Sequence, residues 1–214
     1  MCDYHHIQQE IPASISSAAS LRSFNISSNQ LRTLPIELGK IFSLTTLNAC
    51  DNEISSLPDN FFECLQNLEE LDLSSNKLTA IPSSIGSLES LTSLDLSENC
   101  ELSSLPERTA SLLNLSQLKL YQCAFTTLPP ELASIKTLTW VSFEANPLTH
   151  DEKERIVQSE LAKIVSLDPL QPHESRCPAV SHITRYVSVS FRWTLVTRAS
   201  ARSSPPSPEP LVQR

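Results

Sequence analysis

Residues 68–90 read LEELDLSSNKLTAIPSSIGSLES, and the same order of leucines, asparagine and proline recurs before and after this stretch. Full copies of 23 or 24 residues also begin at Leu21, Leu44, Leu91 and Leu115, and a partial copy begins at Leu138. Such self-similarity at a fixed period is typical of repeat proteins, in which each unit buries its apolar face only against its neighbours. The sequence therefore predicts a solenoid.

Each copy begins with LxxLxL, where apolar and polar residues alternate as they do in a strand. The second and third apolar residues of each segment are expected to point inward, and successive strands to stack in parallel. The inward pairs are Phe24 and Ile26, Leu47 and Ala49, Leu71 and Leu73, Leu94 and Leu96, Leu118 and Leu120, and Val141 and Phe143. A Leu-Pro or Ile-Pro pair then begins an outer segment, expected to be irregular or at most short-helical because proline lacks a backbone donor.

An asparagine recurs where the chain leaves each predicted strand. A buried amide at this place can bond the backbone within and between repeats, as buried polar groups must. We expect a structural ladder made of Asn29, Asn52, Asn76, Asn99, Cys123 and Asn146, with the cysteine as a substitution in the fifth repeat.

The pattern LxxLxLxxNxLxxLPxxIxxLxx across residues 11–150 resembles the leucine-rich-repeat superfamily, in particular the LPxxI repeats of ras-group and scribble-like intracellular proteins. The resemblance implies an α/β solenoid, a horseshoe with a parallel concave sheet and an irregular convex side. It also implies that partners bind on the concave face. The resemblance is specific for the fold and weak for the function, because such repeats serve many partners.

The period divides the chain into a lead-in (1–10), the repeats (11–148), a C-terminal capping helix (149–168) and a tail (169–214). Thr149 followed by Glu152 is a capping-box pattern. The stretch DEKERIVQSELAKIV then predicts a helix that covers the last repeat. Its apolar stripe consists of Ile156, Val157, Leu161, Ile164 and Val165.

The two ends leave alternatives open. The N-terminal end has no comparable cap, so either a partner or another segment covers it, or the chain is a fragment of a longer array. The tail 169–214 carries six Arg and two Glu, and its Ser- and Pro-rich end is typical of disorder. Alternating residues at 183–196 indicate one possible strand, which could pair with a sheet edge or a partner, or belong to a non-native extension.

Charge and composition exclude several functions. The net charge of −8 argues against nucleic acid or an anionic membrane as the partner, and no apolar run is long enough to span a membrane. Neither of the 2 glycines forms part of a phosphate-binding loop. The six cysteines are scattered without a C-x-x-C pair, which favours free thiols in a cytoplasmic protein. His5 and His6 are expected to be solvated, so we expect no metal. We also expect no cofactor and no enzymatic activity.

The outward strand positions predict the binding site. A middle zone is acidic, and a basic patch on the partner protein would complement it. Exposed aromatic residues toward the C-terminal end are candidates for binding hot spots. The predicted residues are Asp51, Glu70, Asp72, Asp95 and Glu98 in the acidic zone, with Lys119, Tyr121 and Trp140 beyond it. The alternative is that the acidic residues only confer solubility and that Trp140 packs on the cap.

The sequence thus predicts a protein–protein interaction module, expected to act as a scaffold or regulator in intracellular signalling. A small GTPase or a signalling complex as the partner follows from the family resemblance alone. Two Asn-x-Ser sequons, at Asn25 and Asn114, keep an alternative open, namely a fragment of an extracellular or receptor-type ectodomain.

Overall fold

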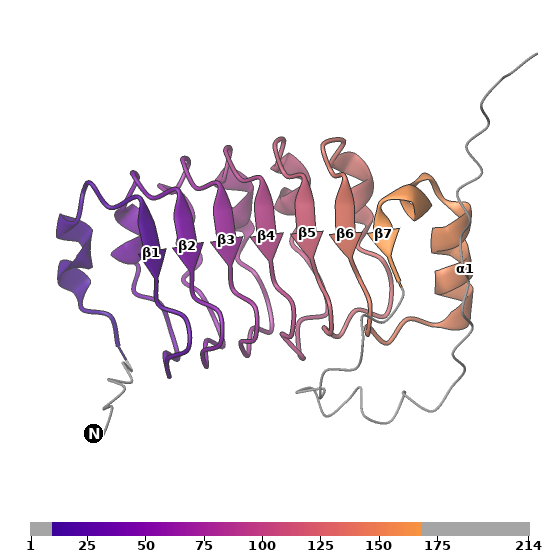
Figure 1. Cartoon of the computed structure of the whole chain (residues 1–214), viewed down its shortest axis with the longest axis horizontal. Coiled ribbons are helices and arrows are strands. Elements are labelled where there is room, and N and C mark those ends of the chain that lie inside the picture. Colours follow the sequence, from indigo (N-terminus) through magenta and orange to yellow (C-terminus); the bar gives the residue numbers. More distant parts are fainter. Residues whose placement is uncertain (1–9, 168–214) are drawn as a thin grey trace, which may run out of the picture. The chain divides into compact units, whose positions relative to one another are not determined.

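In the computed structural model, residues 10–167 are described, and they form a solenoid with one parallel sheet. The seven strands of this region follow one another in chain order, and all point the same way (Figure 1). They are β1 (Ser23–Asn25), β2 (Thr46–Asn48), β3 (Glu70–Asp72), β4 (Ser93–Asp95), β5 (Gln117–Lys119), β6 (Trp140–Ser142) and β7 (Val165–Ser166). Each repeat contributes one short strand, as the period predicts.

The register aligns the same repeat position in every strand. Leu47 pairs with Phe24 on one side and with Leu71 on the other, and this column continues through β6. The predicted inward residues are buried, except Phe24, which is half-buried. Phe24 lies in β1, the first strand of the described region, which pairs with β2.

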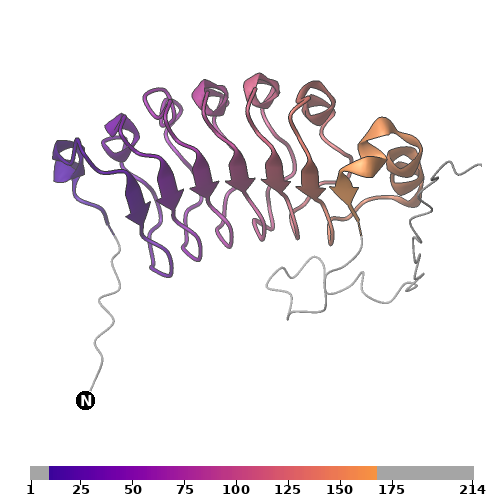
Figure 2. The same ribbon diagram turned by 45° about the horizontal axis from the view of Figure 1, so that its top comes forward.

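Short 3-10 helices and turns form the outer side. The helices are η1 (Ala13–Ser17), η2 (Leu38–Lys40), η3 (Ser83–Ser87), η4 (Glu107–Ser111) and η5 (Pro130–Ser134). Figure 2 shows the strands closer together than these outer segments, which makes the sheet the concave side of the solenoid. The irregular, at most short-helical convex side predicted from the Leu-Pro pattern is confirmed.

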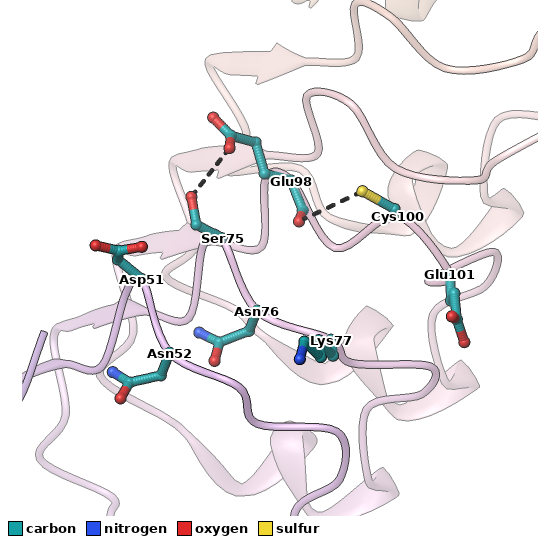
Figure 3. Close-up of a pocket in the computed structure, with 8 residues that line it drawn as sticks. All are labelled: Asp51, Asn52, Ser75, Asn76, Lys77, Glu98, Cys100 and Glu101. Carbon is teal, nitrogen blue, oxygen red and sulfur yellow. Dashed lines mark hydrogen bonds between the residues drawn. The ribbon is translucent and has the colours of Figure 1, made fainter. Parts of the chain in front are cut away.

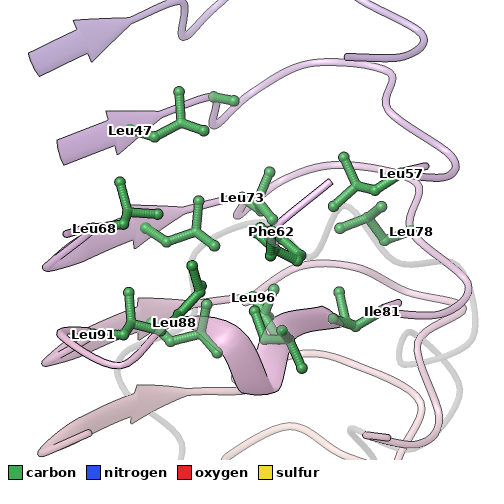
Figure 4. Close-up of a cluster of buried hydrophobic side chains, with 14 of the residues drawn as sticks. Leu47, Leu57, Phe62, Leu68, Leu73, Leu78, Ile81, Leu88, Leu91 and Leu96 are labelled. Atoms are coloured by element: carbon green, nitrogen blue, oxygen red, sulfur yellow. The ribbon is translucent and has the colours of Figure 1, made fainter. Parts of the chain in front are cut away.

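A continuous hydrophobic core fills the space between the sheet and the outer segments (Figure 4). The second repeat has turns instead of an outer helix, and there Phe61 and Phe62 are both fully buried. Their rings meet edge to face, with centroids 5.1 Å apart. Both rings belong to the hydrophobic core.

The C-terminal cap differs from the single helix predicted over 149–168. Helix α1 (His150–Gln158) is followed by η6 (Glu160–Lys163) and then by β7. Ser159 ends the helix, because its hydroxyl donates to the carbonyl of Ile156 and accepts from the amide of Leu161. Consequently the predicted stripe does not lie on one face of one helix: Ile156 is buried, whereas Val157 is 56% exposed.

The predicted capping helix is confirmed as α1, and strand pairing explains why the α-helix does not continue through 159–166. The amides of Val141 and Phe143 donate to the carbonyls of Ile164 and Ser166, at 2.7 and 3.0 Å. A continued helix would leave these edge groups of β6 without these partners, and unpaired backbone groups are costly to bury. The cap therefore closes the sheet edge with a strand and covers the last repeat with α1.

Thr149 and Glu152 form only one of the two hydrogen bonds of a full capping box. The Thr149 hydroxyl accepts from the amide of Glu152, as predicted. The Glu152 carboxylate, however, accepts from the amide of Leu128 at 3.1 Å and pairs with Arg155. It thereby ties the cap to the last full repeat.

Candidate protein-binding face

The outward residues of the central strands place carboxylates side by side on the concave face. Asp72 on β3 lies in register with Asp95 on β4, and Glu70 is the exposed residue two positions before Asp72. Lys119, next in the same row, pairs with Asp95 through Nζ and Oδ2 at 3.0 Å. The predicted acidic zone is thus partly neutralised at its C-terminal side.

Asp72 and Asp95 stand at position five of their repeats, counted from the first leucine of each repeat. This position has a structural role that the sequence did not reveal. The Asp72 Oδ1 accepts from the amide and the hydroxyl of Ser74, at 2.9 and 2.6 Å. The Asp95 Oδ1 likewise accepts from the amide of Ser97. Asn25 and Asn48 make the same bond in their repeats, so the position needs an acceptor for the turn and not a charge.

Asp51 and Glu98 do not lie on the strands. They occupy the eighth repeat position, where the chain turns out of the sheet with a positive φ of 55° and 59°. Every repeat has this left-handed residue, and none of the six is glycine. The acidic zone therefore forms two rows, one on the sheet and one on the strand-exit turns.

The strand-exit turns enclose a hollow of about 250 Å³. It lies between the second and fourth repeats, and Figure 3 shows the side chains around it. Its lining consists of Asp51, Asn52, Ser75, Asn76, Lys77, Glu98, Cys100 and Glu101. The Ser75 hydroxyl donates to Glu98 Oε2 at 3.1 Å, which holds that carboxylate over the hollow. We call this feature the exit hollow.

The two predicted aromatic residues lie at different heights of the face. Trp140, the first residue of β6, is 36% exposed and lies beside Gln117. Tyr121 follows β5 at the seventh position and is half-buried. Burial, with Glu98 and Glu144 nearby, raises the pKa of Tyr121. Beyond Trp140 the outward side chains are no longer exposed: Ser142 and Glu144 are buried and hydrogen-bonded to each other.

The asparagine row forms a hydrogen-bonded ladder behind the exit turns. Asn52 is representative: its Nδ2 donates to the carbonyls of Ile26 and Ala49, and its Oδ1 accepts from the amide of Leu31. Asn76, Asn99 and Asn146 repeat this arrangement. Cys123 keeps only the donor half, with its Sγ 3.3 Å from the carbonyl oxygen of Leu96.

The state of the cysteines differs in part from the expectation of free thiols. Cys50, Cys64 and Cys123 are free, whereas Cys100 is disulfide-bonded. Within residues 10–167, no three His, Cys, Asp or Glu side chains are arranged to hold a metal ion. His5 and His6 lie outside the described residues. No helix of the described region is long and apolar enough to cross a membrane.

Sequence-family models match two adjoining parts of the chain. Residues 20–41 and residues 42–100 each match a model described as leucine-rich repeat. A search of curated proteins gave no match.

Solved structures share the fold. A leucine-rich-repeat protein of Leptospira interrogans is 36% identical, with a TM-score of 0.69 over 76% of this chain. The ectodomain of the Arabidopsis thaliana receptor kinase GASSHO1/SCHENGEN3, in complex with Casparian strip integrity factor 2, is 30% identical, with a TM-score of 0.57 over 65% of this chain. A structure of PEPR1-AtPEP1 is 26% identical, with a TM-score of 0.61 over 77% of this chain.

The chain spans 41%, 17% and 24% of the lengths of these three proteins, in that order. Repeat sequence, parallel sheet and outer 3-10 turns agree with one another and with the family models. This chain is a leucine-rich-repeat protein.

Proposed function

We propose that this protein binds another protein across its concave face. Leucine-rich-repeat domains generally serve as protein-binding modules, and the receptor kinase ectodomain from Arabidopsis thaliana was solved in complex with Casparian strip integrity factor 2. The observation that carries the proposal is the outward row of β3 to β6. There Glu70, Asp72 and Asp95 lie within a few strands of the exposed Trp140.

The partner surface is basic opposite the central strands. Asp72 and Asp95 are adjacent in register, and strands in a sheet are about 4.8 Å apart, so the two charges reinforce each other. Lys119 forms its ion pair with one oxygen of Asp95. It forms none with Glu70 or Asp72. An Arg or Lys side chain of the partner would find two carboxylates within reach of one another.

Trp140 provides the apolar part of the same face. A tryptophan on a mostly polar surface is a typical hot-spot residue, worth about 2 kcal/mol or more when a partner buries it. Trp140 is the outward residue of β6, the last strand before the cap. The proposed contact surface therefore runs from β3 to β6 and ends where Ser142 and Glu144 become buried.

The biological setting is proposed on family analogy. The resemblance to ras-group and scribble-like repeats favours a cytoplasmic scaffold or regulator in signalling, with a small GTPase or a signalling complex as partner. The second candidate is a receptor-type extracellular module. Similarity to a plant receptor ectodomain and the disulfide-bonded Cys100 favour it, since stable disulfides are typical of oxidising compartments.

The test uses isosteric variants that remove charge but keep the turns. The face variant combines Glu70→Gln, Asp72→Asn, Asp95→Asn and Glu98→Gln. Asparagine already caps the same turn at Asn25 and Asn48, so the fold is retained. The matched control neutralises four exposed carboxylates outside the sheet, with Asp59→Asn, Glu63→Gln, Glu89→Gln and Glu107→Gln.

Partners are captured with the full chain from cells that express it and quantified by mass spectrometry. The parent and the control are expected to retain the same partner. The face variant is expected to capture at least tenfold less of it. Trp140→Ala should weaken capture, whereas Leu113→Ala, which removes a 73% exposed leucine outside the sheet, should not. Equal recovery by the face variant and the control would refute concave-face binding.

The compartment is tested separately. Glycosidase treatment of the protein from its source cells is expected to leave its mass unchanged if it is cytoplasmic. A mass shift that disappears with Asn25→Gln or Asn114→Gln would establish the extracellular candidate instead.

A further inference from the structure

We propose that the partner protein presents an extended segment, laid across strands β3 to β6, in which a basic side chain and a large apolar side chain stand four residues apart. The proposal rests on the proposed function and adds the chemistry and the spacing that the concave face selects. Three observations support it: one row of outward residues is exposed, negative charge is concentrated at one strand, and an aromatic residue lies three strands away.

One row of outward residues stays exposed along the sheet. The first residues of β3, β5 and β6 are exposed, whereas the third residues of the same strands are half-buried or buried. The row runs in register across four neighbouring strands (Figure 1). It consists of Glu70, half-buried Ser93, Gln117 and Trp140. A segment that crosses the strands where they begin therefore meets these side chains first.

Negative charge along this row is concentrated at β3. Glu69 and Glu70 are both exposed where β3 begins, and Asp72 lies on the same strand. On the next strand, Asp95 is paired with Lys119 at 3.0 Å, and the Asp95 side chain is only 16% exposed. A cation of the partner is therefore attracted to β3 and not to β4 or β5, because Lys119 repels it there.

Trp140 provides the apolar position of the same row. Its side chain is partly exposed, and the residues between it and Glu70 are uncharged: Ser93 carries a hydroxyl and Gln117 an amide. The row thus offers one cationic position and one apolar position, with a neutral polar stretch between them. An apolar side chain that covers Trp140 removes both groups from water, which is the kind of contact that dominates the binding energy of protein interfaces.

The distance between the two positions favours an extended segment. Three strand spacings separate β3 from β6, and neighbouring strands lie about 4.8 Å apart, so the positions are about 14 Å apart. In an extended chain every second side chain points the same way, and four residues also span about 14 Å. A helix returns to the same face after seven or eleven residues, which is about 11 or 17 Å, and fits less well.

Synthetic peptides test this spacing on the immobilised full chain. The matching probe is an acetylated and amidated peptide of glycine and serine with arginine and phenylalanine four residues apart, made in both orders. The control probe has the same composition with the two residues three apart, which places them on opposite sides of an extended chain. Each probe is carried as four copies on streptavidin, because avidity brings weak binding into a measurable range.

The matching probe, in one of its two orders, is expected to bind about tenfold more tightly than the control probe. The combination of Glu69→Gln with Glu70→Gln, and separately Trp140→Ala, should reduce its binding to that of the control probe. Glu107→Gln, at an exposed carboxylate outside the sheet, should leave it unchanged. Equal binding of the matching and control probes to the parent chain, or no binding by either, would overturn the proposal.

An exchange of two side chains tests the position of the aromatic residue. The variant that combines Gln117→Trp with Trp140→Gln keeps the composition and brings the indole one strand closer to β3, about 10 Å away. Both positions are outward and exposed, so the fold is retained. The preference for the matching probe should disappear, because four extended residues no longer fit the distance. A preference that survives the exchange would refute the spacing.

Failure of this proposal is distinguishable from failure of the proposed function. If the face variant loses its captured partner while the matching and control probes bind equally, concave-face binding stands and the extended segment is wrong. If the face variant and its control recover the partner equally, concave-face binding itself is wrong, whatever the probes show.

Discussion

The backbone amide of Leu102 donates to the carbonyl oxygen of Asn99, at 3.0 Å, within its own repeat. The equivalent amides of Leu31, Ile54, Leu78 and Phe125 each donate to the side-chain oxygen of an asparagine one repeat further on. At Leu102 that place is taken by Cys123, which has no such oxygen. The extra residue after Asn99 and the cysteine at 123 therefore compensate each other.

This relationship predicts a non-additive pair of mutations. Cys123→Asn alone should lower the free energy of unfolding by about 1–3 kcal/mol, because its Oδ1 would be buried without a donor. Deletion of Glu101 alone should also destabilise, since the Leu102 amide loses its turn acceptor. Together the changes restore the regular ladder, and chemical denaturation should give a double variant more stable than the sum of the single effects. Strict additivity would contradict the compensation.

Cys123 is predicted to be the least reactive of the free thiols in the described region. Burial raises the pKa of the Cys123 thiol to about 12, whereas Cys64 is exposed. At pH 8 a thiol reagent should therefore label Cys64 quickly and Cys123 only as fast as the protein unfolds. Mass spectrometry of timed digests measures both rates, and rapid labelling of Cys123 in the native protein would be inconsistent with its burial.

The same shift has a consequence for stability at high pH. The folded-state pKa of Cys123 lies above its ordinary value of 9.0, so the neutral thiol stabilises the fold fully below pH 9. This contribution is lost as the pH rises from about 9 to about 12, because only the unfolded chain ionises there. The advantage of the wild type over Cys123→Ala should shrink over this window in denaturation experiments.

Thr109 offers a stabilising substitution. It occupies the place in η4 that Ile85 and Leu132 hold in the neighbouring outer helices, and it is buried. Its hydroxyl has no hydrogen-bond partner, and such a group costs about 1–3 kcal/mol. Thr109→Val keeps the shape and should raise the midpoint of thermal unfolding by about 2–4 °C for each kcal/mol recovered. Thr137→Val serves as the control and should lower it, since the Thr137 hydroxyl donates to the Leu115 carbonyl at 2.8 Å.

The two glycines are predicted to be sterically required on the convex side. A Cβ at Gly39 would lie 2.2 Å from the carbonyl oxygen of Phe61, and one at Gly86 would lie 2.6 Å from that of Arg108. Backbone must move in both cases, so alanine should cost about 1–3 kcal/mol, with Gly39→Ala the more severe. Denaturant midpoints measure the order. Ala110→Ser, at the half-buried residue of η4 that corresponds to Gly86, is the control and should change little.

The repeat sequence determined which residues face the core and which form the ladder. Leu71 and Leu73 alternate with Asp72. A nearly constant repeat length of 23 or 24 residues brings the same alternation into register in every strand. Position within a repeat is a local property, so it could be predicted from the residues alone. The acidic row of Glu70, Asp72 and Asp95 followed for the same reason.

Only the tertiary structure decided what depends on neighbours distant in the sequence. Asp51 and Glu98 belong to exit turns, because a left-handed residue is needed there for the chain to leave the sheet, and their side chains give no sign of it. Residues 165 and 166 became strand β7, because the open edge of β6 offered backbone donors that a helix could not satisfy. Glu144 is buried while Trp140, on the same strand face, stays exposed. Periodicity assigns each side chain to the inward or the outward face. Strand pairing at the edge of the sheet and packing at the end of the solenoid depend on contacts that no single repeat contains.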